Sequence, residues 1–183
     1  FGIEKAAFYF DGQSSVIIPD APHLRSEEMT IIFWYQVEHQ NPQPILFKGN
    51  IVNQNDFNYS IRVGPGEIEG RIQHGSDCIN TNMIEGGTAI SEHNDCWTQF
   101  AFTFTKLGFS FYENGFKIYE AYGTSRDEFC EGESLSIANG GYAPNNFFEG
   151  KIDDLRIFDT VLSNDDILLI YNNEAPEQTN CEP

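Results

Sequence analysis

The feature that most constrains the fold is a succession of short strand-like segments separated by turns. The segments are rich in β-branched and aromatic residues, which pack well on a pleated sheet. Turn residues recur at a spacing of roughly 8–12 residues, as in sandwiches of antiparallel strands. The predicted strands are Ala6–Phe10, Ser15–Ile18, Met29–Val37, Ile45–Lys48, Tyr59–Val63, Glu67–Gln73, Trp97–Thr105, Gly108–Glu113, Phe116–Tyr122, Leu135–Ala138 and Lys151–Phe158.

Two of these segments have patterns that predict how they are buried. In Trp97–Thr105, three phenylalanines alternate with Gln99, Ala101 and Thr103, which indicates a strand buried on one face. In Met29–Val37, both alternating sets of residues are apolar. That pattern predicts a central strand covered on both faces.

The clearest local prediction is a hairpin at Asn114-Gly115. Asn-Gly between two apolar runs favours a two-residue type I′ turn, whose twist matches that of paired strands. Such a loop places Tyr112 opposite Lys117 and Phe111 opposite Ile118.

One helix is predicted, over Asn164–Tyr171. Ser163 fits the N-cap position, and Asp166 completes a capping-box pattern three residues later. From residue 172 onward the sequence is polar and contains two prolines, which is typical of a linker. We therefore expect one domain over residues 1–172 and a linker or tail over residues 173–183.

The charge of the chain restricts its partners. Lys and Arg number 10 against 28 Asp and Glu, a formal net charge of −18 at pH 7. Such a field repels phosphate backbones and anionic membrane surfaces, so we expect neither nucleic-acid binding nor membrane insertion. The longest apolar runs are also too short to span a bilayer.

The four cysteines are Cys78, Cys96, Cys130 and Cys181, and none forms a C-x-x-C pair. An even number with wide spacing predicts two disulfides and an oxidising compartment, hence a secreted or cell-surface location. Three pairings are possible, and we expect Cys78–Cys96 with Cys130–Cys181. No signal peptide is visible, which suggests a mature form or a piece of a longer protein with further domains.

Three segments together resemble the laminin-G-like and concanavalin-A-like jelly-roll domains. They are Ala7–Gly12 followed by Ser15–Ile18, then Met29–Tyr35, and finally Phe148–Phe158 followed by Leu162-Ser163 and the helix. Trp97 and the Tyr112–Gly115 hairpin lie in the expected order between them. The resemblance implies an all-β, two-sheet antiparallel jelly-roll sandwich with one short C-terminal helix. Because lectins and glycosidases share this architecture, the fold alone does not define the function.

The resemblance also implies a calcium site. It would be formed by Asp11, after the first strand, and Asp153, in the last, since the terminal strands are neighbours in this family. Calcium prefers six to eight oxygen ligands, which carboxylates and backbone carbonyls supply. The alternative is structural: Asp11 caps its own turn, and Asp153 or Asp154 pairs with Arg156.

Candidate sugar-binding aromatics lie at the end of the predicted strand Phe116–Tyr122 and in the segment before the last strand: Tyr122, Tyr142, Phe147 and Phe148. Tyr122 and Tyr142 offer exposed rings for stacking, and Asn145 and Asn146 can donate and accept hydrogen bonds to hydroxyls. The alternative is that the segment around Tyr142 is an ordinary turn. Trp34 and Trp97 occupy positions where the family has core residues, so we expect them to be packed inside.

A catalytic role is not predicted. Glu67 and Glu69 are two apart on a strand, as in related glucanases with a Glu-x-Asp-x-Glu strand, but the third acid is absent and Arg71 stands there. The sequence thus favours a non-catalytic, calcium-stabilised carbohydrate-binding module of a secreted multidomain protein. The alternative is a laminin-G-type adhesion module that binds a cell-surface or matrix protein. A glycoside hydrolase or lyase is the least favoured.

Overall fold

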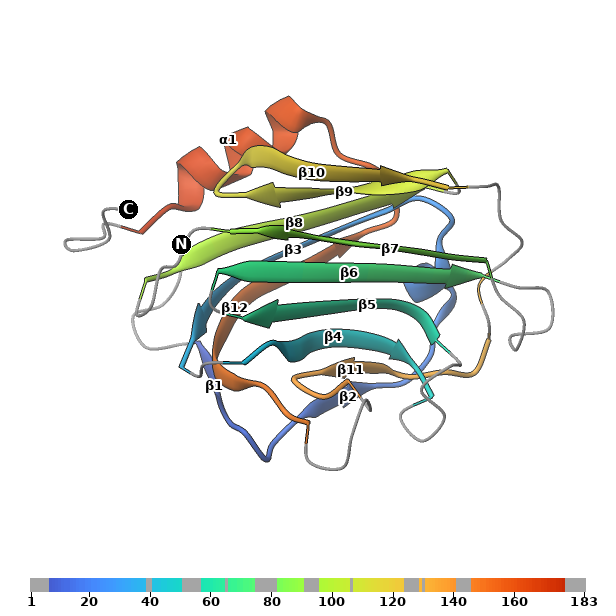
Figure 1. The fold of residues 1–183 in the computed structure, drawn as a ribbon, viewed down its shortest axis with the longest axis horizontal. Coiled ribbons are helices and arrows are strands. Elements are labelled where there is room, and N and C mark those ends of the chain that lie inside the picture. The colour runs from blue at the N-terminus through green and yellow to red at the C-terminus, as the bar shows by residue number, and fades with distance from the viewer. Residues whose placement is uncertain are drawn as a thin grey trace.

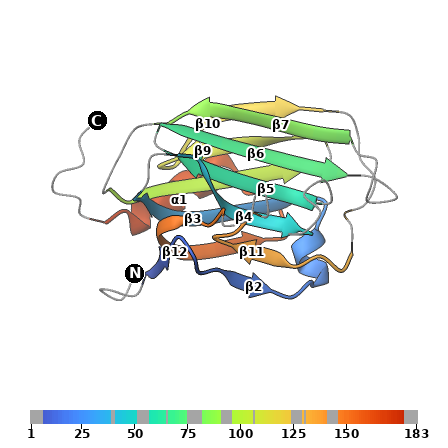
Figure 2. The same ribbon diagram turned by 60° about the horizontal axis from the view of Figure 1, so that its bottom comes forward.

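The computed structural model describes residues 7–38, 41–50, 57–64, 66–74, 82–90, 96–105, 107–123, 129, 131–140 and 146–176. These residues form two six-stranded antiparallel sheets packed face to face (Figures 1 and 2). The first sheet has the order β1 (Phe8–Asp11), β12 (Glu149–Phe158), β3 (Met29–Val37), β8 (Thr98–Thr105), β9 (Gly108–Glu113), β10 (Phe116–Tyr122). The second has the order β2 (Val16–Ile18), β11 (Leu135–Ile137), β4 (Gln43–Gly49), β5 (Phe57–Gly64), β6 (Glu67–His74), β7 (Asn82–Ala89). The predicted all-β jelly-roll sandwich is confirmed.

Every predicted strand is present with small shifts of its ends, but one strand was missed. β7 lies between residues 74 and 96, where no strand was predicted, and it pairs with β6 along its whole length. Its sequence, Asn-Met-Ile-Glu-Gly-Gly-Thr-Ala, carries little apolar signal because it is an edge strand. Ile84 is its buried hydrophobic residue.

Aromatic side chains dominate the core between the sheets. Phe100, Phe102, Phe104 and Phe111 are fully buried there. Phe111 packs over Gly70 of the opposite sheet so closely that a Cβ at this glycine would lie 2.5 Å from Cζ of the ring. The glycine is therefore required to let the two sheets approach at this point.

The helix α1 (Asn164–Glu174) covers the face of the first sheet that points away from the second sheet (Figure 2). Ile167 packs there against Ile32, Ala101 and Tyr112, and Tyr171 stacks on Trp34 at a centroid distance of 5.8 Å. The strand β3 is thus buried on both faces, as predicted. The one-sided burial predicted for β8 is wrong, because Gln99, Ala101 and Thr103 are buried as well.

Both predicted ends of the helix can be compared with the structure. Ser163 accepts a hydrogen bond from the Asp166 backbone, and the Asp166 side chain accepts one from the Ser163 backbone, which confirms the capping box. The helix continues three residues beyond Tyr171, to Glu174, whose side chain pairs with Arg156 of β12. The polar residues after Tyr171 are therefore helical at first.

The hairpin between β9 and β10 has the predicted turn. Asn114 and Gly115 both have positive φ, 50° and 84°, as a type I′ turn requires. Lys117 lies opposite Tyr112 as predicted. The predicted pairing of Phe111 with Ile118 is wrong, because a bulge between Lys117 and Tyr119 places Tyr119 opposite Phe111 instead. The Phe111 and Tyr119 rings stack at 5.5 Å.

Candidate functional site

A groove of about 580 Å³ lies on the outer face of the first sheet, beside the start of α1. It is bounded by β8, β9 and β10 on one side and by the segment that leads into the helix on the other; these elements are at the top of Figure 1. Its lining is formed by Thr103, Phe104, Thr105, Leu107, Gly108, Phe109, Ser110, Tyr112, Lys117, Glu120, Tyr122 and Val161–Asp165.

The strand register explains which side chains reach the groove. Thr103, Ser110 and Glu120 form one row across the three strands, and Thr105, Gly108 and Tyr122 form the next. In a regular strand, Lys117 would point to the opposite face from Glu120 and Tyr122. The bulge turns both Ile118 and Tyr119 toward the core, so Lys117, Glu120 and Tyr122 all line the groove.

The opposite wall is fixed to the sheet by two buried side chains. Thr30 Oγ1 donates to Thr160 O and accepts from Leu162 N, at 2.8 and 2.9 Å. Tyr112 donates its hydroxyl to Asn164 Oδ1 at 2.7 Å. The wall is therefore held in place without a ligand, as in most small-molecule sites.

The polar residues of the groove form a linked set. Lys117 Nζ donates to Glu120 Oε2 at 3.0 Å. This hydrogen bond, followed by one with Tyr122, holds the pKa of the Glu120 carboxyl below its usual value. The same bond to Glu120 raises the pKa of Lys117, and Glu120 raises the pKa of the Tyr122 hydroxyl. The Tyr122 ring is 77% exposed and thus available for stacking.

Among the predicted sugar-binding residues that the structure describes, Phe148 is buried in the core and is not available for stacking. Tyr122 lines the groove, whereas Asn146 precedes β12 and is absent from its lining. Tyr142 and Asn145 lie outside the described residues. Lys117, Glu120 and the role of Val161–Asp165 as a wall of the groove were not predicted. The conformation of that wall at Ser163 was predicted from the capping-box pattern, but the bulge that exposes Lys117 has no signal in the sequence.

The two predicted calcium ligands are separated by the strand register. β1 and β12 are neighbours, as expected, but Asp11 pairs with Glu149 while Asp153 lies four residues further along β12. At about 3.3 Å per residue, Asp153 is displaced from Asp11 by roughly 13 Å along the strands, too far for both carboxylates to bind one ion. Asp11 accepts from the backbones of Gln13 and Ser14, so it caps its turn. Within the described ranges, no three His, Cys, Asp or Glu side chains form a metal cluster.

The Glu67 and Glu69 pair lies on the outer face of the second sheet. Glu69 Oε2 accepts from Arg62 Nη1 at 3.0 Å, and neither carboxyl lines the groove. The predicted disulfides are outside the described residues apart from Cys96. Cys96 is buried, and no described cysteine has a free thiol. The pairing of Cys78, Cys130 and Cys181 stays a prediction.

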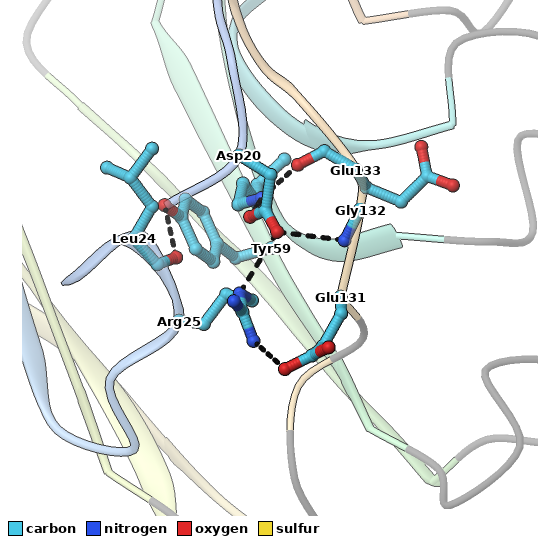
Figure 3. Close-up of polar contacts among 8 residues, drawn as sticks. Asp20, Leu24, Arg25, Tyr59, Glu131, Gly132 and Glu133 are labelled. Atoms are coloured by element: carbon cyan, nitrogen blue, oxygen red, sulfur yellow. Dashed lines mark hydrogen bonds and ion pairs between the residues drawn. The ribbon is translucent and has the colours of Figure 1, made fainter. Parts of the chain in front are cut away.

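A second polar cluster joins three segments at one end of the sandwich (Figure 3). The fully buried Lys48 donates to Asp20 Oδ1 at 2.6 Å and to the Glu133 carbonyl. Asp20 Oδ2 accepts from Gly132 N at 2.8 Å and lies 3.2 Å from Arg25 Nε. Burial alone would raise the pKa of Asp20, but hydrogen bonds from Lys48 and Gly132 outweigh it and lower the pKa. Because its groups bind one another, this cluster is structural.

The comparisons with known proteins define the family. The sequence matches the family described as the concanavalin A-like lectin/glucanases superfamily, a laminin-G type, over residues 10–168. The chain belongs to this superfamily. No curated protein sequence matches it. The described part of the chain also has no helix long and apolar enough to cross a membrane.

Solved structures with the same fold include toxin binding domains. The binding domain of botulinum neurotoxin serotype D is 20% identical, with a TM-score of 0.69, covering 92% of this chain and 42% of that one. The same ligand-binding domain in complex with N-acetylneuraminic acid is 17% identical, with a TM-score of 0.64, covering 87% and 40%. The chain thus spans about two fifths of these toxin domains, and the likeness establishes the fold alone.

Proposed function

We propose that this domain is a non-catalytic carbohydrate-binding module and that sugar binds in the groove between β8–β10 and the start of α1. The supporting observation is an exposed Tyr122 ring beside hydroxyl and charged groups in a groove whose far wall is already held in place. Such sites usually contain an aromatic ring that stacks on the sugar and a few polar groups that fix the orientation of the sugar. A toxin domain of this fold in complex with a sugar is consistent with the proposal.

Replacing Tyr122 by alanine is expected to weaken glycan binding at least tenfold, or about 1.4 kcal/mol. The loss follows because Tyr122 is the exposed aromatic ring of the described lining on which a sugar can stack. Glycan-array screening followed by titration calorimetry measures it. Tyr9→Ala is the matched control, since Tyr9 is an exposed tyrosine at the other edge of the same sheet. Equal loss in both variants, or binding to matrix proteins but to no glycan, would contradict the proposal.

Hydrolysis is not part of the proposal. Retaining and inverting glycosidases both need two carboxyls facing each other across the scissile bond. Glu120 and Asp165 are the carboxylates of the groove lining, and Glu120 is neutralised by Lys117. Glu69 is held by Arg62 on the other sheet. We therefore expect no release of reducing ends from polysaccharides that the domain binds.

We also propose that the domain acts outside the cell, within a larger secreted protein, and that calcium stabilises it. The register makes Glu149, directly opposite Asp11, the better second carboxylate. Like charges at such a cross-strand pair are unfavourable without a cation.

Calcium is expected to raise the melting midpoint of the parent protein and to raise it less in Glu149→Gln. Asp153→Asn is the control and keeps the full rise, because its position is too far from Asp11. Calcium at 100 times its Kd would add about 2.7 kcal/mol. Thermal melting in calcium and in chelator tests this, and identical midpoints for the parent protein would exclude stabilisation.

A further inference from the structure

The charges around the groove do not suit an acidic ligand. Lys117 is the cation among the described residues of the lining, and its ammonium is already bound to Glu120. An acidic sugar that drew Lys117 away would leave the Glu120 carboxylate uncompensated in the same groove. The attraction to one charge would thus be offset by repulsion from the other.

The opposite wall adds further negative charge. A helix N-terminus usually favours anions, but the first turn of α1 carries Asp165 and Asp166. Asp166 already occupies the cap, through its hydrogen bonds with Ser163. In the described lining, Lys117 is set against two acids, Glu120 and Asp165, and Asp166 adds a further negative charge in the same turn of the helix.

The remaining groups of the groove suit neutral hydroxyls. Ser110 and the Lys117–Glu120 pair present donors and acceptors, and the exposed side chains of Tyr122, Leu107 and Val161 supply uncharged contact area. The net charge of −18 repels polyanions at longer range. We infer that the groove selects uncharged sugars and rejects acidic ones, including sialylated and uronic glycans. This inference rests on the proposed sugar-binding function and specifies its ligand class.

The test compares the binding of neutral sugars with that of acidic sugars derived from them. β-Glucan, mannan and galactan are each presented unmodified and after oxidation of their C6 hydroxyl groups to carboxyls, with lactose and sialyllactose as a further pair. Affinity electrophoresis and calorimetry at about 20 and 150 mM salt report binding, because salt screens the repulsion. At least one of the neutral sugars is expected to bind. Its acidic partner is expected to bind at least tenfold more weakly at low salt.

Two variants separate the possible results. Glu120→Gln frees Lys117. It is expected to reduce the ratio of the affinities for a neutral ligand and its acidic partner by threefold or more, whereas Tyr9→Ala leaves this ratio unchanged. The inference would be overturned if acidic sugars bind the parent protein as tightly as their neutral partners and this binding is lost in Tyr122→Ala. The sugar-binding function would stand in that case. Absence of binding to every sugar would overturn the proposed function and, with it, the inference. Melting curves of each variant establish that it is folded.

Discussion

Replacing Phe111 by alanine is expected to lower the free energy of unfolding by about 3–5 kcal/mol. The ring is 0% exposed and meets Phe100, Phe102, Phe109 and Tyr119 at centroid distances of 4.9 to 5.6 Å. Alanine would leave a cavity between the sheets, because Gly70 opposite has no side chain to fill it. Chemical denaturation measures the loss, and the melting midpoint is expected to fall by roughly 6–20 °C.

The matched control is Phe116→Ala, in the strand next to Phe111. Phe116 is 63% exposed, so its loss is expected to change stability by less than about 0.5 kcal/mol. Gly70→Ala tests the same contact from the other side, since a Cβ there overlaps the Phe111 ring. It is expected to cost about 1–3 kcal/mol. A Phe111→Ala variant as stable as Phe116→Ala would show that the sheets do not meet at this ring.

Replacing Asp20 by asparagine is expected to cost about 3 kcal/mol, because it leaves the Lys48 ammonium buried without a counter-charge. Lys48 is 0% exposed and Asp20 is 15% exposed in their side chains. Adding Lys48→Met to this variant is expected to restore part of the loss, since an apolar residue of similar length removes the unpaired charge. Denaturation of the two single variants and the double variant measures this coupling.

The pH dependence of the Asp20 variant has a defined sign. The pKa of Asp20 is lowered in the folded state, so its carboxylate stabilises the fold above the ordinary aspartate pKa of about 3.9. The difference in the free energy of unfolding between Asp20→Asn and the parent protein is therefore expected to be constant from about pH 5 to 7. It is expected to shrink in stronger acid. Glu85→Gln is the control, because its pair with Arg71 is exposed and worth about 0–1 kcal/mol. Equal effects of Asp20→Asn and Glu85→Gln would contradict the role of the buried cluster.

Much of the fold could be predicted because the local signals agree with the tertiary structure. The Asn114-Gly115 turn, the two-sided apolar strand at Met29–Val37 and the Ser163 cap each determine their own conformation. β7 was missed for the opposite reason. A polar edge strand with adjacent glycines is specified by its pairing with β6 and not by its own residues.

The candidate site was less predictable. Tyr122 was selected as an aromatic at the end of a strand, and the structure places it in the groove. Its neighbours Lys117 and Glu120 share that face only because of a bulge, which depends on how Ile118 and Tyr119 pack in the core. The pairing of Asp11 with Glu149 depends on a register set by long-range contacts, so the choice of Asp153 could not be corrected from the sequence.

The position of β12 has a consequence for how the protein is made. This strand lies between β1 and β3, so the first sheet stays incomplete until almost the whole chain has been synthesised. Pairings between segments so distant in sequence form slowly, in milliseconds to seconds for proteins rich in such contacts. Until then, β1 has no partner, and the apolar β3 has an open edge that could pair with another chain. Pairing of β12 with both strands therefore removes the edge through which copies of the chain could associate.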